Sequence, residues 1–274
     1  MMKRIFAAVV ALCATTVSAF ADTPYDPIPP TIPNLVGWYD ASYTPSLTLS
    51  GSDVTAWADR SGTGNNLNVV TSPAPFYTAS CLNSLGCVNF GGTSILSRAS
   101  TNFNVANAPS TIILIGSGRP LTSTQTLAAG YGTFTTLQWR GAGVQNASGN
   151  TYPYIGLFGA DMVTPQAITD DVPFIASYVF GSSSQSVSAN GYTRSTQTFT
   201  PSTVGTGFQV GSATSFNPWR GKIEEVLVYN AAITQAQEDY LVGYLACKWG
   251  IQASLNSSFT YATSCPWYAS PLFL

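Results

Sequence analysis

Short runs of β-forming residues alternate with turn residues along almost the whole chain, and this alternation limits the fold most. From Asn34 onward, clusters of Gly, Ser, Asn and Pro separate the runs, without helical patterns between them. The best predicted strands are residues 54–58, 87–90, 111–116, 133–139, 173–180 and 222–229. This spacing predicts an all-β sandwich. The run at residues 111–116 is continuously apolar, as expected of a strand covered on both faces.

One helix is signalled near the C-terminus. Thr234 can cap its start, and Gln237 three residues later completes a capping box. Apolar and aromatic residues then recur at helical spacing up to Trp249, and Gly250 ends the helix. We expect this apolar stripe to pack against the sandwich.

The first 21 residues have the pattern of a bacterial-type secretory signal peptide. A basic start precedes an apolar run, and residues 19–21 (Ala-Phe-Ala) form a cleavage site. The apolar run is too short to span a bilayer comfortably, and Leu12 before Cys13 does not suit a lipid-attachment site. We therefore expect a secreted, periplasmic or cell-surface protein with no membrane span after cleavage.

The remaining chain divides into three predicted parts. Residues 22–33 are Pro-rich and should form an extended leader. Residues 34–252 suit one large β domain. Residues 253–274 form an aromatic, nearly uncharged tail, which we expect to pack on the domain or on a partner.

Four cysteines remain after removal of the signal peptide, namely Cys81, Cys87, Cys247 and Cys265. An even number in an exported chain favours two disulfides, and four cysteines allow three pairings. Proximity in the sequence favours Cys81–Cys87 and Cys247–Cys265. A zinc site is not expected, because no Cys-x-x-Cys pair and no histidine accompany them.

Composition excludes several functions. Only 8% of residues are charged, the net charge is −2 and there is no basic run, so nucleic-acid binding lacks its electrostatic basis. The chain has no histidine, which excludes Ser-His-Asp and Cys-His catalysis. Glycoside hydrolysis remains, because it needs only two carboxylates. Glu224 and Glu225 are neighbours on a predicted strand and should face opposite sides, so we assign no catalytic residue.

Six segments, in this order and spacing, resemble parts of one known superfamily. They are residues 35–42 (LVGWYDAS), 54–66 (VTAWADRSGTGNN), 173–180 (PFIASYVF), 187–191 (VSANG), 208–211 (FQVG) and 219–230 (WRGKIEEVLVYN). Together they resemble the opening strands, the Asn-Gly hairpin and the closing strand of the laminin-G-like, concanavalin A-like lectin/glucanase superfamily. The resemblance implies a two-sheet antiparallel jelly-roll sandwich with one C-terminal α-helix. Laminarinase-type relatives carry a Glu-x-Asp-x-x-Glu run, which this sequence lacks.

The Asp-x-Ser-Gly-x-Gly-Asn turn of this resemblance contains a candidate metal site. Asp59 can accept hydrogen bonds from the backbone N–H groups that follow it, and so stabilise the turn by itself. The alternative is that Asp59 and Asn65 help to hold a structural Ca²⁺ ion through oxygen ligands. Calcium is the one cofactor that the sequence suggests.

The loop-rich middle of the chain carries the residue types of a glycan site. Aromatic rings stack on the C–H faces of sugars, while Asp, Asn, Gln and Arg bind hydroxyl groups. Trp139, Arg140, Tyr152, Tyr154 and Asp161 are the predicted ligand-binding residues. Each aromatic ring among them could instead serve packing.

Three functions remain open. The sequence favours a secreted carbohydrate- or surface-binding, lectin-like module without catalysis, whose partner is a glycan or cell-surface polymer. A structural or adhesive subunit of an extracellular assembly is the alternative, because low charge and an apolar tail suit self-association or a protein partner. A glycoside hydrolase is the third.

Overall fold

The computed structural model describes residues 31–120, 125–157, 159–205, 207–212 and 217–265. The predicted signal peptide, most of the leader and the end of the tail lie outside the described residues. Among the residues described, there is no helix with the length and apolar character needed to cross a membrane.

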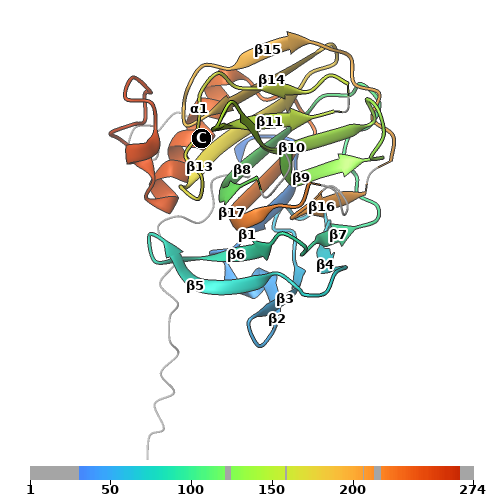
Figure 1. Cartoon of the computed structure of the whole chain (residues 1–274), viewed down its shortest axis with the longest axis vertical. Coiled ribbons are helices and arrows are strands. Elements are labelled where there is room, and N and C mark those ends of the chain that lie inside the picture. Colours follow the sequence, from blue (N-terminus) through green and yellow to red (C-terminus); the bar gives the residue numbers. More distant parts are fainter. Residues whose placement is uncertain (1–30, 121–124, 158, 206, 213–216, 266–274) are drawn as a thin grey trace, which may run out of the picture.

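Among the described residues, antiparallel strands are the main elements, together with one α-helix, α1 (Gln235–Trp249), and two short 3-10 turns, Thr44–Ser46 and Gln252–Ser254 (Figure 1). The strands are β1 (Leu35–Asp40), β2 (Leu47–Ser50), β3 (Asp53–Trp57), β4 (Leu67–Val69), β5 (Phe76–Leu82), β6 (Leu85–Gly91), β7 (Leu96–Arg98), β8 (Ser110–Arg119), β9 (Gln125–Gly132), β10 (Trp139–Ala147), β11 (Asn150–Gly156), β12 (Met162–Val163), β13 (Phe174–Phe180), β14 (Ser184–Ala189), β15 (Ser195–Thr198), β16 (Phe208–Val210) and β17 (Arg220–Tyr229). The prediction of an all-β antiparallel fold with one C-terminal helix is confirmed.

Two runs of strands make up the sheet. The first run is β15–β14–β13–β8–β17, and β1 and β6 share the far edge of β17. The second run is β12–β11–β10–β9–β16–β7–β4–β3–β2. Strand β5 pairs with both β6 and β3 and so joins the runs into one continuous, nearly closed sheet. The separate two-sheet jelly roll predicted from the sequence is therefore not confirmed.

The middle of the first run, around β8, is buried on both faces. Ile112 and Leu114 of β8 belong to the core between the two runs, whereas Ile113 and Ile115 belong to a second cluster that packs under α1. Alternation of side chains along the strand produces this division. The predicted two-face burial of residues 111–116 is confirmed.

Helix α1 covers the outer face of the first run. The Thr234 side chain accepts a hydrogen bond from the backbone N–H of Gln237, and the Gln237 side chain accepts one from the backbone N–H of Thr234. Gly250 ends the helix in the left-handed conformation. The capping box and the stop signal are thus confirmed. Trp249, in the last turn, is completely buried.

Strand β17 contains an irregularity that decides which way its charges point. Ile223 pairs with Gly116 and Glu225 pairs with Ile115, so Glu224 is the extra residue of a β-bulge. Ile223 therefore joins the inner core. Glu224 and Glu225 end in separate surroundings, although the bulge interrupts the regular alternation of the strand at this point.

One predicted strand is wrong. Residues 133–138 form bends and turns, and β10 begins only at Trp139. Leu137 has a positive φ angle, which a regular strand does not contain. The β-forming residues of this segment made it resemble a strand.

Both predicted disulfides are confirmed. Cys81 is bonded to Cys87 within the β5–β6 hairpin, and Cys247 of α1 is bonded to Cys265 in the tail. The disulfides are compatible with an extracellular location.

Candidate functional site

Three of the five predicted ligand-binding residues come together on the outer face of the second run. The Trp139 ring lies across the glycines of β9 and β10, because a Cβ at Gly130 would lie 2.6 Å from it. Tyr154 packs in the same small cluster, and its hydroxyl is hydrogen-bonded to Asp161. Burial and Asp161 together raise the pKa of Tyr154. Both rings are only 2% exposed, so little of either could touch a ligand in this conformation.

Tyr152 and Arg140 differ from that group. Tyr152 is half-buried and lies two residues before Tyr154 on β11, which places it on the same face. Arg140 follows Trp139 on β10 and points the other way, into the interior. Its guanidinium donates to Ser110, Tyr131 and Thr203, and to the carbonyl of Ala106, at 2.6–3.1 Å. Arg140 is completely buried, so the structure does not bring all five residues to one surface. Ligand binding by this set stays a prediction.

The Asp59 turn is satisfied by its own hydrogen bonds. One carboxylate oxygen accepts from the backbone N–H groups of Trp38 and Ser61, at 2.8–2.9 Å. The other accepts from the hydroxyls of Ser61 and Thr63 and from the N–H of Asn65, each at 2.9 Å. These five donors occupy the lone pairs that a cation would need. Among the described residues no group of three Cys, Asp or Glu side chains could hold a metal ion, and Ca²⁺ binding by Asp59 and Asn65 stays a prediction.

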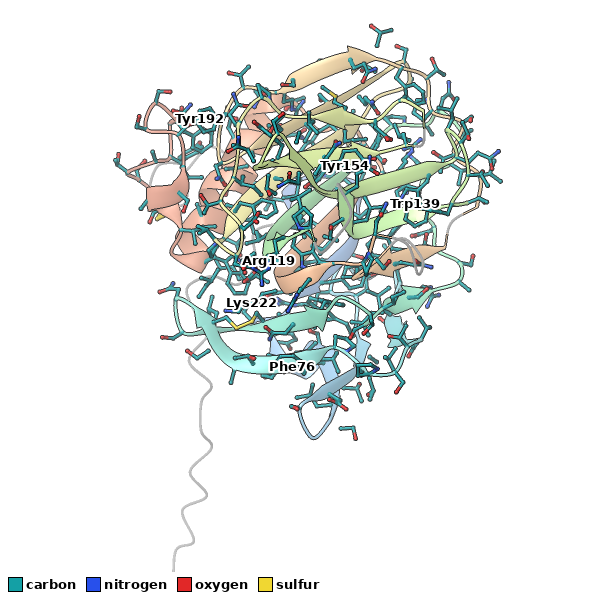
Figure 2. The ribbon with its side chains drawn as sticks, in the orientation of Figure 1. Phe76, Arg119, Trp139, Tyr154, Tyr192 and Lys222 are labelled. Atoms are coloured by element: carbon teal, nitrogen blue, oxygen red, sulfur yellow. A yellow bond between two sulfur atoms is a disulfide. The ribbon has the colours of Figure 1, made fainter. Side chains whose placement is uncertain are left out.

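Two hollows open on either side of Tyr192. Tyr192 follows the Asn190–Gly191 turn at the end of β14 and is 39% exposed. The helix-side hollow has a volume of about 270 Å³, and the strand-side hollow one of about 250 Å³. Figure 2 shows Tyr192 on a different side of the molecule from Trp139 and Tyr154.

The helix-side hollow is lined mainly by groups that can bind hydroxyls. Asp239 and Gln235 come from the first turns of α1, and Asn256 comes from the tail. The Gln235 amide donates to Asp239 at 2.8 Å. Phe259 adds a second aromatic ring to the wall. Amides, one carboxylate and two rings therefore meet in one cavity.

The strand-side hollow is bounded by the chain that leads into β13. Its wall contains Val172 and Pro173 as apolar groups, and Thr169, Asn190 and Ser254 as polar ones. The Asn190 side-chain oxygen accepts the N–H of Ile175 at 2.9 Å, which fixes the turn to β13. Tyr192 thus lines both hollows.

The tail packs against the Asn190–Gly191 turn, directly before Tyr192. Phe259 packs on Gly191, where a Cβ would lie 2.5 Å from its ring, and Phe259 stacks edge-on with Tyr261. The N–H of Asn256 donates to the carbonyl of Asn190 at 2.8 Å. Sequence analysis identified the Asn-Gly turn and the packing tail separately but did not assign Tyr192. The aromatic residue directly after an Asn-Gly turn is the signal that could have identified it.

Most buried acids serve the fold. Lys248 of α1 donates to Asp40 of β1 and to Glu225 of β17, each at 2.8 Å, and Arg60 donates to Asp40 at 2.5 Å. Burial alone would raise the pKa of Asp40, but Lys248, its neighbour Ser42 and Arg60 hold it below the usual range. Glu225 also accepts from the indole N–H groups of two tryptophans, at 2.7–2.8 Å.

Two further buried acids differ in how they are satisfied. Glu238 of α1 is hydrogen-bonded to Ser188 and paired with Arg194. Glu224 is completely buried, and neither of its carboxylate oxygens has a hydrogen-bond partner among the described residues. Burial raises the pKa of Glu224 to about 8, despite the nearby positive charge of Lys222. Glu224 is therefore mostly protonated at neutral pH, and it reaches no surface where it could meet a substrate.

No protein-family model matches the chain, and no curated protein matches its sequence. Solved structures do share its fold. A GH54 α-L-arabinofuranosidase superposes with a TM-score of 0.60 at 11% identity, over 72% of this chain and 51% of that one. This chain therefore spans about half the length of that enzyme.

Two other structures place this fold within larger proteins that act on carbohydrates. Domain 4 of AbnA, a GH43 extracellular arabinanase from Geobacillus stearothermophilus, was solved with arabinotriose. It matches with a TM-score of 0.56 at 17% identity, over 74% of this chain and 96% of that domain. A Trypanosoma rangeli sialidase matches with a TM-score of 0.53 at 15% identity, over 78% of this chain and 33% of that one. These neighbours show that the chain has a fold used by carbohydrate-active proteins.

Proposed function

We propose that this protein is a secreted, non-catalytic carbohydrate-binding module, and that Tyr192 is the platform on which a sugar ring stacks. One observation carries the proposal. A large aromatic side chain that is 39% exposed stands between two hollows of about 270 and 250 Å³, both lined by amide and hydroxyl groups.

The chemistry of the site suits a neutral glycan. The face of a tyrosine ring attracts the C–H groups of a sugar, while Asp239, Gln235 and Asn256 can bind its hydroxyls. Each hollow is smaller than the roughly 300–1,000 Å³ typical of pockets for drug-sized ligands. We therefore expect each to take one sugar unit of a chain that passes over Tyr192.

The neighbours support the choice of a first ligand. Domain 4 of AbnA is matched over almost its full length, and that domain was solved with arabinotriose. Arabinotriose is therefore the first probe, although the identity is too low to assign a ligand. The absence of a role in catalysis is proposed because the acid in the helix-side hollow, Asp239, has no second carboxylate beside it in that lining.

Replacement of Tyr192 by alanine tests the proposal. We expect Tyr192→Ala to weaken binding of arabinotriose, or of the best ligand in a panel of neutral oligosaccharides, by about tenfold, as lost stacking on an aromatic ring implies. Isothermal titration calorimetry measures this loss. Tyr43→Ala is the matched control, because Tyr43 is 42% exposed and absent from both hollows.

Thermal unfolding of both variants shows whether each remains folded. Equal affinity of Tyr192→Ala and the unchanged protein would exclude Tyr192 as the platform. Absence of binding to every neutral oligosaccharide in the panel would exclude the function itself.

A further inference from the structure

A second surface lies where helix α1 does not cover the first run. Arg119 of β8 pairs directly with Arg220 of β17, and Lys222 of β17 pairs with Asn89 of β6. Asn89 in turn pairs with Phe76 of β5. We call these five residues the cationic strip. Figure 2 shows Arg119, Lys222 and Phe76 one below the other on the same part of the molecule.

The side chains of the strip share the outer face. Ile223 belongs to the inner core, so Lys222 and, two residues before it, Arg220 point outward. Directly paired residues of neighbouring strands lie on the same face, which places Arg119, Asn89 and Phe76 there too. Neighbouring strands are about 4.8 Å apart, so the row from β8 to β5 is about 15 Å wide.

The strip is open to solvent. Arg119, Arg220 and Lys222 are exposed, and Phe76 is 45% exposed. Among the residues that the structure describes, Arg220 and Lys222 have no ion-pair partner. Arg119 has one weak, exposed partner, Asp171, at 3.4 Å.

This arrangement costs stability without a gain within the fold. Like charges directly opposite each other on neighbouring strands repel, and Arg119 faces Arg220 in this way. The protein as a whole is slightly acidic, with a net charge of −2. Its other described cations are used differently. Arg60, Arg194 and Lys248 pair with acids, Arg140 is buried, and the half-buried Arg98 donates to the carbonyl of Ser100. A local concentration of exposed positive charge is therefore a specific feature of this surface.

We propose that the cationic strip binds an acidic polysaccharide. Arg119, Arg220 and Lys222 would pair with anionic groups spaced along the polymer. Phe76 would stack on a sugar ring at the end of the row. The Asn89 amide nitrogen already donates to Thr78, so the Asn89 side-chain oxygen would accept from a sugar hydroxyl. The aromatic ring and the amide beside the cations favour a sugar polymer over a simple polyanion such as DNA. The strip shares no residue with the Tyr192 hollows, so this proposal stands apart from the neutral-glycan site.

The test uses the full chain and defined polymers. Affinity electrophoresis compares polygalacturonate, which carries carboxylates, with dextran sulfate, neutral dextran and duplex DNA. We expect binding to at least one acidic polysaccharide and not to neutral dextran, and weakening with added salt. The two acidic polymers distinguish carboxylate from sulfate as the group that is bound.

Variants locate the binding surface. The double variant Arg220→Ser with Lys222→Ser should weaken binding by about tenfold, because two exposed ion pairs are lost. Phe76→Ala should also weaken binding without any change of charge. The single variant Arg220→Ser is compared with Arg98→Ser on β7, outside the strip, which removes the same one charge and should bind as the unchanged protein does.

Three results would overturn the proposal. They are absence of binding to both acidic polymers, an equal loss with Arg98→Ser, and DNA binding as tight as polysaccharide binding with no effect of Phe76→Ala. Tyr192→Ala should leave acidic-polymer binding intact, so failure of either site is distinguishable from failure of the other.

Discussion

Strand β17 runs from a surface where its charged side chains are exposed to one where they are buried under α1. In the first half, Arg220 and Lys222 face solvent without an acidic partner among the described residues. In the second half, Glu225 is completely buried and bound by Lys248 and two indole N–H groups. Between them, Glu224 is buried and its carboxylate has no hydrogen-bond partner.

The difference separates charge that serves the fold from charge available to a ligand. A buried ion must be paired and hydrogen-bonded, or it is neutralised. Glu225 is paired and hydrogen-bonded, whereas Glu224 is neutralised by a proton. The exposed cations Arg220 and Lys222 need neither, because water solvates them at little cost. Three substitutions examine these three environments separately.

Loss of the buried cation should have the largest effect. Lys248→Met leaves Glu225 without its cation and Asp40 with Arg60 alone, so we expect the free energy of unfolding to fall by about 3–5 kcal/mol. Chemical denaturation measures it. Lys222→Met is the control on the exposed half of the strand and should change stability by less than about 0.5 kcal/mol. Similar losses in both variants would remove the distinction between the two halves.

Glu224 should give a smaller, pH-dependent effect. Its pKa rises from 4.5 in the unfolded chain to about 8 in the folded protein. Between these values the folded state binds more protons, so its stability falls as pH rises from about 4.5 to 8. Glu224→Gln has no such proton to lose, and it should be more stable than the unchanged protein by about 2 kcal/mol at pH 6 and about 4 kcal/mol at pH 8.

The advantage of Glu224→Gln should vanish near pH 4, where the carboxyl is protonated in both states. Urea denaturation at pH 4, 6 and 8 follows the difference. A constant difference across this range would show that Glu224 does not titrate between the folded and unfolded states.

Relief of repulsion in the cationic strip should have the smallest effect. Arg220→Thr removes the like-charge pair with Arg119 and adds a strand-forming residue, so we expect a gain of about 0.2–1 kcal/mol. Thermal unfolding at low ionic strength measures the gain, which should shrink when salt is added. A loss of stability would show that Arg220 supports the fold, and the repulsion argument would then fail.

Much of the fold followed from local signals in the sequence. The helix start at Thr234 and its stop at Gly250 depend on a few neighbouring residues, and both were predicted correctly. The disulfides followed from proximity. The closure of the sheet through β5 could not be predicted, because its pairing with β3 involves a single pair of residues, Asp53 and Phe76.

The candidate sites were harder to predict because distant segments build them. The helix-side hollow combines the turn after β14, the start of α1 and the tail. Composition identified Trp139 as a candidate platform, but its ring lies flat on glycines of the sheet and is almost fully buried. Arg140 follows Trp139 in the sequence, but side chains alternate along a strand, so the Arg140 side chain points into the interior.

The bulge at Glu224 also decides which face the first half of β17 presents to solvent. Ile223 pairs with Gly116 and Glu225 with Ile115, so one residue of β17 is unmatched on β8. Deletion of Glu224 alone would leave Ile223 and Glu225 as neighbours in the same pairing, so Lys222 and Arg220 would still face outward. Loss of the bulge without loss of a residue would instead turn the first half of the strand over, with Lys222 and Arg220 toward the core and Gly221 toward solvent. A homologue that lacks the residue at position 224 should therefore keep positions 220 and 222 on the outer surface.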